Sequence, residues 1–181
     1  MVITTSREPG NRTRSFVNEL VTILPVLVKV NRGKATLLDL YDISISKRAK
    51  WLIIVYEKKG NPSMLKIFKP DIPKSGLDEK YRILLRGVTL YREKARSKPS
   101  TYNGEYCISF GGDEDVYALT GIVSEVTGYR FCKANVDSNV RRIRISVVND
   151  VKTVSFHDER GNLVGPIIRV RRIEVVSDDN S

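Results

Sequence analysis

The first part of the chain passes from a short apolar run to a clear helical period. Val2 to Thr5 is typical of a strand, and a loop with Pro9 and Gly10 follows it. From Arg12 to Leu24 the apolar residues recur at helical spacing, and Pro25 ends the run. The apolar residues of this stripe are Phe16, Leu20, Ile23 and Leu24. This pattern predicts a strand followed by a helix with one buried face.

A second strand and a second helix are predicted next. Val26 to Val30 is a β-branched run that Asn31 to Lys34 interrupts. Thr36 can cap a helix that has Asp39 at its third position. The apolar face of that helix is Leu37, Leu40 and Tyr41. Trp51 to Tyr56 is apolar on both faces, which is typical of a central strand covered by helices. Alternating strands and helices favour parallel pairing.

The rest of the chain is richer in strands. Another strand is expected at Met64 to Phe68, and Lys69 to Gly76 has two prolines and no periodicity. We therefore place a boundary there, between residues 1–76 and 77–181. A helix is expected after the acidic run Asp113 to Asp115 and before Gly128. The remaining predicted strands are Tyr81 to Tyr91, Glu105 to Phe110, Val140 to Val148, Val151 to His157 and Leu163 to Val175.

Together these elements predict a mixed α/β (α+β) fold built from two halves. The first half has a mostly parallel sheet with helices, and the second is strand-rich with one main helix. The length of 181 residues suits one ordinary domain or two small halves that share a core.

The charge balance points to a polyanionic partner. There are 31 Lys and Arg against 21 Asp and Glu, which gives a formal charge of +10 and a pI near 9.7. Nucleic acid is favoured over a membrane surface, because the sequence has no amphipathic basic helix and no lipidation signal. No apolar run approaches the length that crosses a bilayer, and Met1 to Ser6 lacks the features of a secretory signal. We therefore expect a cytoplasmic protein.

Few residues could support catalysis. His157 is the only histidine, and the sequence has no G-x-S-x-G, phosphate-binding or dinucleotide-binding motif. Cys107 and Cys132 are the only cysteines, so we expect buried thiols rather than a disulfide framework or a zinc site. The acidic residues are scattered or start the predicted helix. We predict no catalytic residue, metal or cofactor.

Basic residues gather where the first strand ends and the first helix starts. Arg7, Arg12 and Arg14 lie there, beside helix amides that bind anions. Arginines in a first helical turn oppose the helix dipole, so neither Arg12 nor Arg14 is expected to support the fold. A parallel unit would bring Arg32 and Lys34 to the same sheet edge and form one basic rim. The alternative is that these charges only solvate the surface.

Two later strands carry a second basic pattern. Arg142 and Arg144 alternate with buried-type residues on one strand, and Arg169 and Arg171 do so on another. If these strands are neighbours, like charges lie side by side unless an anion or an acid covers them. The candidate acids are Glu159 and Glu174. Base stacking on Tyr91, Tyr102 or Tyr106 is less favoured than packing of these rings.

Several segments of the chain together form a distinctive pattern. They are Ile3 to Arg7, Arg12 to Phe16, Glu19 to Leu20 and Asn31 to Lys34 at the start, and Arg141 to Val147, Val164 to Pro166 and the basic strand to Val175 later. The first set resembles the opening of Brix-domain proteins, and the second set resembles the end of the same domain. A glycine-proline-threonine stretch of eukaryotic members is absent, and Lys69 to Pro73 stands in its place, as in a minimal archaeal-type version.

The resemblance implies a single Brix domain with a duplicated α/β fold. Each half is similar to the anticodon-binding domain of some aminoacyl-tRNA synthetases. It also implies a non-enzymatic role in ribosomal RNA processing and subunit assembly, with ribosomal RNA or its precursor as partner and ribosome assembly proteins as further candidates. The alternative is a scaffold that binds an assembly protein and has little affinity for RNA. A nuclease is disfavoured because no catalytic constellation is visible.

Overall fold

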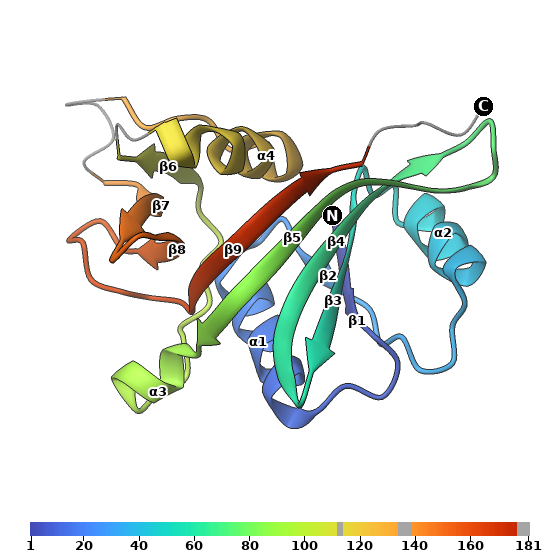
Figure 1. Ribbon diagram of the computed structural model, residues 1–181, viewed down its shortest axis with the longest axis horizontal. Coiled ribbons are helices and arrows are strands. Elements are labelled where there is room, and N and C mark those ends of the chain that lie inside the picture. The colour runs from blue at the N-terminus through green and yellow to red at the C-terminus, as the bar shows by residue number, and fades with distance from the viewer. Residues whose placement is uncertain (112–113, 134–138, 177–181) are drawn as a thin grey trace.

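A single mixed sheet organises the chain. The computed structural model describes residues 1–111, 114–133 and 139–176. Nine strands of these residues form one sheet with the order β2-β1-β3-β4-β5-β9-β8-β7-β6 (Figure 1). The strands are β1 (Val2–Thr5), β2 (Val28–Lys29), β3 (Leu52–Lys58), β4 (Asn61–Asp71), β5 (Gly76–Thr89), β6 (Tyr106–Phe110), β7 (Arg141–Val148), β8 (Val151–His157) and β9 (Ile167–Val175). The helices are α1 (Asn11–Ile23), α2 (Leu37–Ser46), α3 (Tyr91–Ala95) and α4 (Tyr117–Thr127), and the short 3-10 helix η1 (Glu114–Val116) precedes α4.

The strand order repeats on either side of the β5–β9 pair. In the first half β1 is parallel to β3, and β4 and β5 continue the sheet antiparallel. In the second half β6 is parallel to β7, and β8 and β9 continue it in the same way. The halves join where β5 and β9 run antiparallel through the middle of the molecule (Figure 1). The predicted mixed α/β fold is confirmed, although the β3–β4–β5 pairings make the first sheet less parallel than expected.

The predicted boundary lies inside a hairpin. Lys69, Pro70 and Asp71 are paired with the start of β5, and the turn between them closes with a bond from the Ser75 amide to the Ile72 carbonyl, 3.1 Å. Hairpin turns and linkers use the same turn-forming residues, so the two prolines did not distinguish them. By the repeat in strand order, the first half ends with β5 at Thr89.

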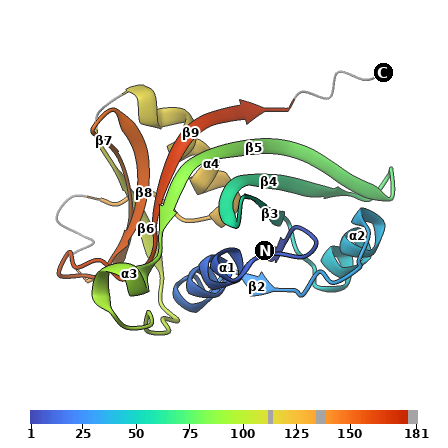
Figure 2. The same cartoon turned by 60° about the horizontal axis from the view of Figure 1, so that its bottom comes forward.

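The core forms on both faces of the first half. One cluster joins α1 and α4 to strands of both halves, with Phe16, Leu119 and Phe156 among its buried members. A smaller cluster places Leu40 of α2 on the opposite face, against Leu52 of β3. This confirms that β3 is covered on both sides. Figure 2 shows how the sheet bends between β5 and β8, so that one layer wraps the shared core.

Local signals fixed the helix ends as predicted. Asp39 donates its backbone N–H to the Thr36 hydroxyl at 3.2 Å, and its carboxylate accepts from the Thr36 amide at 2.7 Å, which completes the predicted capping box. Gly128 ends α4 in the left-handed conformation, with φ of +73°. Asp113 of the acidic run lies outside the described residues, and α4 itself begins at Tyr117.

Some strand limits differ from the predicted ones. The second strand is reduced to Val28–Lys29, and Tyr91 starts α3 instead of ending β5. The last strand begins at Ile167, because Gly165 and Pro166 precede it. No helix within the described ranges is long and apolar enough to cross a membrane.

The prediction of two buried thiols is wrong, because Cys107 and Cys132 form a disulfide. Cys107 lies on β6, and Cys132 follows Phe131, which makes a parallel bridge to Ile108. The Cys132 amide also donates to the Ile108 carbonyl at 2.9 Å. Tertiary pairing thus brings together two cysteines 25 positions apart, which a count of cysteines does not reveal.

The disulfide is expected to stabilise the second half. Replacing both cysteines, as Cys107→Ala with Cys132→Ala, should lower the free energy of unfolding by about 3 kcal/mol, because a loop of this length gains entropy in the unfolded chain. Denaturant titration measures the difference. Reductant should shift the wild-type midpoint towards that of the variant and leave the variant unchanged. Equal midpoints for the oxidised wild type and the variant would contradict the expectation.

Candidate nucleic-acid interface

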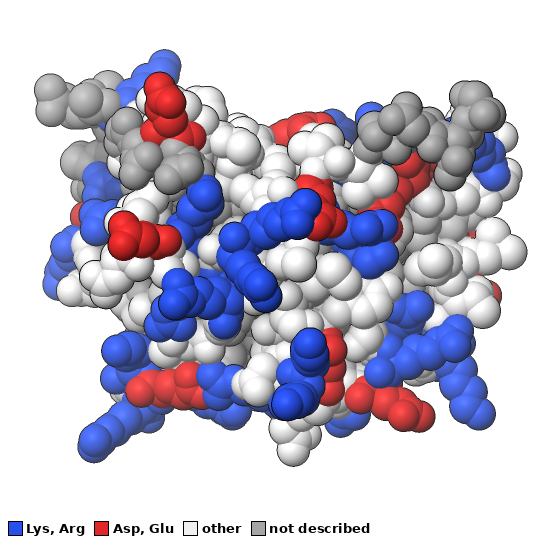
Figure 3. Space-filling model, in the orientation of Figure 1, with Lys and Arg blue, Asp and Glu red and all other residues white. Residues whose placement is uncertain are grey.

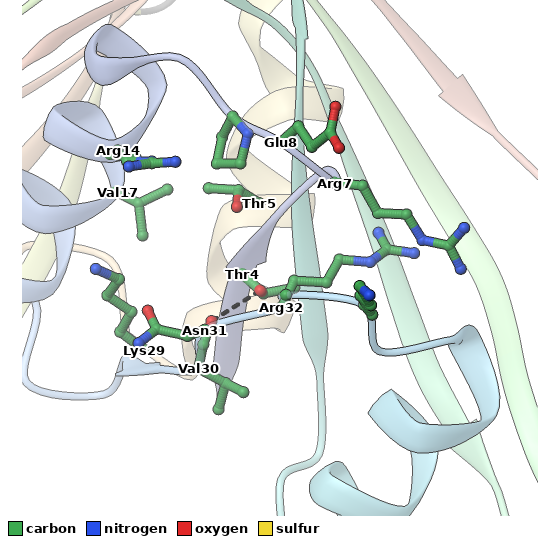
Figure 4. A pocket seen from close by; sticks show the side chains of 13 residues that line it. Thr4, Thr5, Arg7, Glu8, Arg14, Val17, Lys29, Val30, Asn31 and Arg32 are labelled. Atoms are coloured by element: carbon green, nitrogen blue, oxygen red, sulfur yellow. Dashed lines mark hydrogen bonds between the residues drawn. The ribbon is translucent and has the colours of Figure 1, made fainter.

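An open cleft of about 800 Å³ lies where β1 and β2 end. These strands are parallel, so their carboxyl ends and the loops that follow them meet at one edge of the sheet. We call this cleft, with the side chains that line it, the basic cleft (Figure 4). Its basic residues are Arg7, Arg14, Lys29, Arg32 and Lys34, and its other lining residues are Thr4, Thr5, Glu8, Pro9, Val17, Val30, Asn31 and Gly33.

The walls of the basic cleft are held by backbone and hydroxyl bonds. The buried Thr4 hydroxyl donates to the Val30 carbonyl at 2.8 Å, which ties the end of β1 to the end of β2 (Figure 4). Arg32 donates from Nε to the Ala35 carbonyl at 3.3 Å, and Lys29 donates from Nζ to Oδ1 of Asn18 at 2.8 Å. The loop between β2 and α2 is therefore held by a bond of its own, and the end of β2 is tied to α1.

Positive charge dominates the basic cleft. Five cations face one acid, Glu8, among the lining residues. None of the five forms an ion pair with a carboxylate in the described part of the chain. The first turn of α1 has no acidic residue, and its N-cap, Gly10, offers no side-chain cap. Glu57, however, accepts from the Gly10 amide at 2.8 Å, so a carboxylate already lies at the start of α1.

Four of the predicted residues of the basic rim meet in this cleft. Figure 4 shows Arg7 and Arg32 extending close to one another, while Arg14 lies across the cleft on α1. Lys34 joins them from the loop before α2. Lys29 was missed by the sequence reasoning, although it is the last residue of β2 and so lies at the same sheet edge.

Arg12 does not belong to the basic cleft. It donates from Nη2 to the Val88 carbonyl at 2.9 Å and forms a two-armed ion pair with Glu93. Residues two positions apart in a helix are about 200° apart around its axis, so Arg12 and Arg14 face nearly opposite directions. The expectation that Arg12 lies beside Arg32 and has no part in the fold is wrong.

Arg12 is one half of a clamp between α1 and α3. Glu19, which is buried on α1, accepts from the Tyr91 amide at 2.7 Å and from the Arg92 amide at 3.4 Å. Glu93 accepts from the Leu90 amide at 3.0 Å, and the bond from Arg12 lowers the pKa of the Glu93 carboxyl. Two residues that carry the family resemblance, Arg12 and Glu19, therefore have a structural role.

A second basic surface lies on the second half of the sheet. We call it the arginine face, and it consists of Arg142 and Arg144 on β7 and Arg169 on β9, with polar residues of β8 between them. In register, Arg142 pairs with His157, Arg144 with Ser155 and Arg169 with Thr153. Ile143 and Ile145 point to the other face, into the core. Figure 3 shows Lys and Arg side chains gathered over the middle of the molecule, with fewer acids.

The predicted clash of like charges required the arginines of β7 and β9 to be direct neighbours, and they are not. β8 separates the two strands, so its hydroxyls lie between the guanidinium groups. Arg169 donates to the Thr89 hydroxyl at 2.9 Å. Arg171 lies at a bulge in the β5–β9 pairing. Glu174 pairs with Arg172 at 3.4 Å and with Arg82 at 3.8 Å, and neither of these was the predicted partner.

The three tyrosines considered for stacking are mainly packing residues. Tyr106 is 2% exposed and belongs to the core. Tyr102 lies edge-on to it at 5.4 Å and is covered by the guanidinium of Arg141, 4.0 Å from the ring centre. Tyr91 starts α3 and donates its amide to Glu19.

The single histidine shows no catalytic arrangement. His157 is a partly exposed strand residue, as expected, and contacts the Ser155 hydroxyl at 2.9 Å through Nε2 and the Gly161 carbonyl at 3.0 Å through Nδ1. Within the described residues no group of three or more His, Cys, Asp or Glu side chains is placed to hold a metal ion.

Comparison with known proteins places this geometry in context. No family model matches the chain. A protein of Saccharolobus solfataricus is 39% identical over 103 residues, which cover 57% of this chain and 54% of that protein. A protein of Sulfurisphaera tokodaii is 38% identical over 93 residues, which cover 51% of each chain. Both are described as probable Brix domain-containing ribosomal biogenesis proteins, and the match spans about half of their length.

The fold has a close counterpart among solved structures. The crystal structure of a probable ribosomal biogenesis protein from Aeropyrum pernix superposes with a TM-score of 0.82 and 26% identity, over 97% of this chain and 98% of that one. The similarity therefore extends through both halves of the sheet.

The different roles of Arg12 and Arg14 are testable by stability. Arg12→Ala should lower the free energy of unfolding by about 1–2 kcal/mol, because it removes a two-armed ion pair and a bond to a carbonyl. Arg14→Ala, the matched control, should change it little, because Arg14 is exposed. Chemical denaturation compares the two. Equal effects would contradict the assignment.

The effect of Arg12→Ala should also depend on pH. The pKa of Glu93 is lowered in the folded state from its ordinary value of 4.5. The ion pair therefore contributes fully above that value, and its contribution is lost as the pH falls through the lowered pKa. Denaturation at neutral and acidic pH should show the difference between wild type and Arg12→Ala shrinking in acid. A difference independent of pH would show that Glu93 is not the partner that matters.

Proposed function

We propose that this chain is a Brix-domain protein and a non-enzymatic ribosome biogenesis factor that binds ribosomal RNA or its precursor. The observation that carries the proposal is the basic cleft, where five cations converge around one acid. Such a site suits an anion with many charges along its length, and the RNA backbone is of that kind. Cytoplasmic location is part of the same proposal.

The cleft favours contacts to phosphate over reading of base sequence. Each arginine side chain is a two-pronged donor to phosphate oxygens, and each lysine side chain is a single charged donor. RNA duplexes are recognised mainly by shape and backbone, since side chains do not reach the bases in their deep groove. We therefore assign shape and backbone recognition to this cleft.

The arginine face supplies a second backbone contact in this proposal. Arg144 is exposed on β7, and Arg169 lies two strands away on β9. Strands are spaced about 4.8 Å apart, and the two arginines pair with β8 residues two positions apart, so their backbone positions are about 12 Å apart across the sheet. An RNA strand or duplex has phosphates on both sides of such a span.

A protein scaffold is the second candidate, and exposed apolar residues favour it. Leu38 on α2 is 59% exposed, Leu37 is 46% exposed, and Ile72 at the tip of the β4–β5 hairpin is 69% exposed. Large apolar side chains in such positions mark protein-binding surfaces when they form a patch. A purified chain that binds no RNA but retains a protein partner after nuclease treatment would support this candidate.

The RNA-binding proposal predicts different effects for two double variants that each remove two positive charges. Arg14→Gln with Lys34→Gln removes two cations from the basic cleft. Lys47→Gln with Lys50→Gln removes two exposed cations beyond α2 and leaves the same net charge. In filter binding to a ribosomal RNA fragment, the first pair should weaken affinity about tenfold, and its salt dependence should fall by about 0.7–0.9 per lost phosphate contact.

The control pair should bind within about twofold of wild type, because salt screens the attraction between the RNA and charges outside the cleft. An equal loss in both pairs would show that only bulk charge matters. A wild-type affinity that does not fall with salt would reject RNA backbone binding altogether.

The contribution of the arginine face is measured separately. Arg144→Gln should lower the salt dependence by a further 0.7–0.9 or so, one phosphate contact, when combined with the cleft variants. Additive losses are expected, because the two surfaces share no residue. If Arg144→Gln has no effect in the same titration, the arginine face is not part of the RNA path.

A further inference from the structure

Three aromatic rings form an exposed cluster at the outer edge of the second half. We call them the aromatic cluster: Phe110 at the end of β6, Tyr117 at the start of α4, and Phe131. They are 41%, 51% and 47% exposed. Phe110 is at the centre, with ring-centre distances of 5.8 Å to Tyr117 and 5.7 Å to Phe131, both in edge-to-face geometry. None of the three belongs to the hydrophobic core.

The backbone holds the cluster in place. β6 is the last strand of the sheet (Figure 1), and Phe131 is bridged to it at Ile108. The disulfide between Cys107 and Cys132 fixes the residue that follows Phe131. Edge-to-face contacts leave ring faces uncovered, and the aromatic rings are fixed before any ligand arrives. A preformed aromatic platform loses little entropy on binding.

Charge beside the cluster favours a nucleic acid as its occupant. Arg130 and Lys133, both exposed, flank Phe131 in the chain. Ser109, which precedes Phe110, pairs in register with Arg144 of the arginine face, whereas Phe110 pairs with Ile145 and lies on the core side of the sheet, as α4 does. Cations bind the phosphates and exposed ring faces stack the bases, so the two together are the elements of single-strand recognition. Glu114, exposed on η1, lies on the Tyr117 side, so the phosphates are expected on the Phe131 side.

We propose that the aromatic cluster stacks unpaired bases of a single-stranded RNA segment whose backbone lies along the Phe131 side of the cluster, by Arg130 and Lys133. This inference rests on the proposed RNA-binding function and adds to it a preference for RNA with unpaired bases. Bases within a duplex are already stacked on each other and expose no face to a ring. The basic cleft and arginine face would bind backbone of either kind, and the aromatic cluster would distinguish the two.

Substitutions of Phe131 test stacking against simple apolarity. Phe131→Leu keeps an apolar side chain but removes the ring, and Phe131→Tyr keeps the ring. The probes are a short single-stranded RNA with one 2-aminopurine and a duplex of the same length. Phe131→Leu should weaken single-strand binding about tenfold and remove the fluorescence change of stacked 2-aminopurine, while Phe131→Tyr should restore both. Duplex affinity should stay as in wild type.

Two control variants accompany this test. Val148→Ala alters another exposed apolar residue, 51% exposed at the end of β7, and should leave both affinities unchanged. Tyr117→Leu tests the cluster from α4, away from the disulfide, and should also weaken single-strand binding. It replaces Phe131→Leu in the test if thermal unfolding shows that Phe131→Leu is unstable.

The outcomes separate this inference from the function on which it rests. If wild type binds neither RNA, the proposed function fails and the inference with it. If wild type binds both but Phe131→Leu and Tyr117→Leu keep full single-strand affinity, only the stacking inference is overturned. Loss of a protein partner in these variants, with RNA affinity unchanged, overturns it as well and identifies the cluster as a protein contact.

Discussion

The parallel placement of β1 between β2 and β3 is the constraint on which the functional surface depends. All four residues of β1 are buried, and Val2 and Ile3 pack on opposite faces of the sheet. Since β1 and β2 run in the same direction, the loops after them open at one edge. The side chains of the basic cleft therefore converge although they come from separate segments of the chain. If β2 ran antiparallel to β1, Arg7 and Arg32 would lie at opposite edges of the sheet.

The first helix combines three roles because of its period. One side presents Arg14 to the cleft, another packs Phe16 and Leu20 into the core, and a third holds Arg12 and Glu19 against α3. Charged residues that lie close in sequence thus have unrelated functions. Burial and partners decide between the roles: Glu19 is enclosed and bonded to two amides, whereas Arg14 is exposed and has no carboxylate partner among the described residues.

The features that were predictable from sequence are local ones. The strand Val2–Thr5, the stripe of α1 and the capping box at Thr36 each depend on residues a few positions apart, and all three are confirmed. The convergence of most of the basic rim also followed, because parallel strands have a fixed geometry. The family resemblance contributed the expectation of a duplicated fold, to which the repeated strand order corresponds.

The features that were missed depend on long-range pairing. The partner of Arg12 is Glu93, and that of Cys107 is Cys132; neither pair has a local sequence pattern. The exposure of Phe110 was hidden for the same reason, since an apolar residue in a strand is normally expected to be buried.

The two halves share a strand order but differ in what covers their sheets. Between β1 and β3 the chain forms α1 and α2, which cover both faces of the first half. Between β6 and β7 the described residues form only η1 and α4, and α4 packs on the core side. The face that α2 covers in the first half is thus occupied in the second by side chains such as Arg144, Ser155 and Arg169. With one helix fewer among the described residues of its second half, the duplicated fold leaves this face without a covering helix, and in the proposed function this face is a second surface for the RNA backbone.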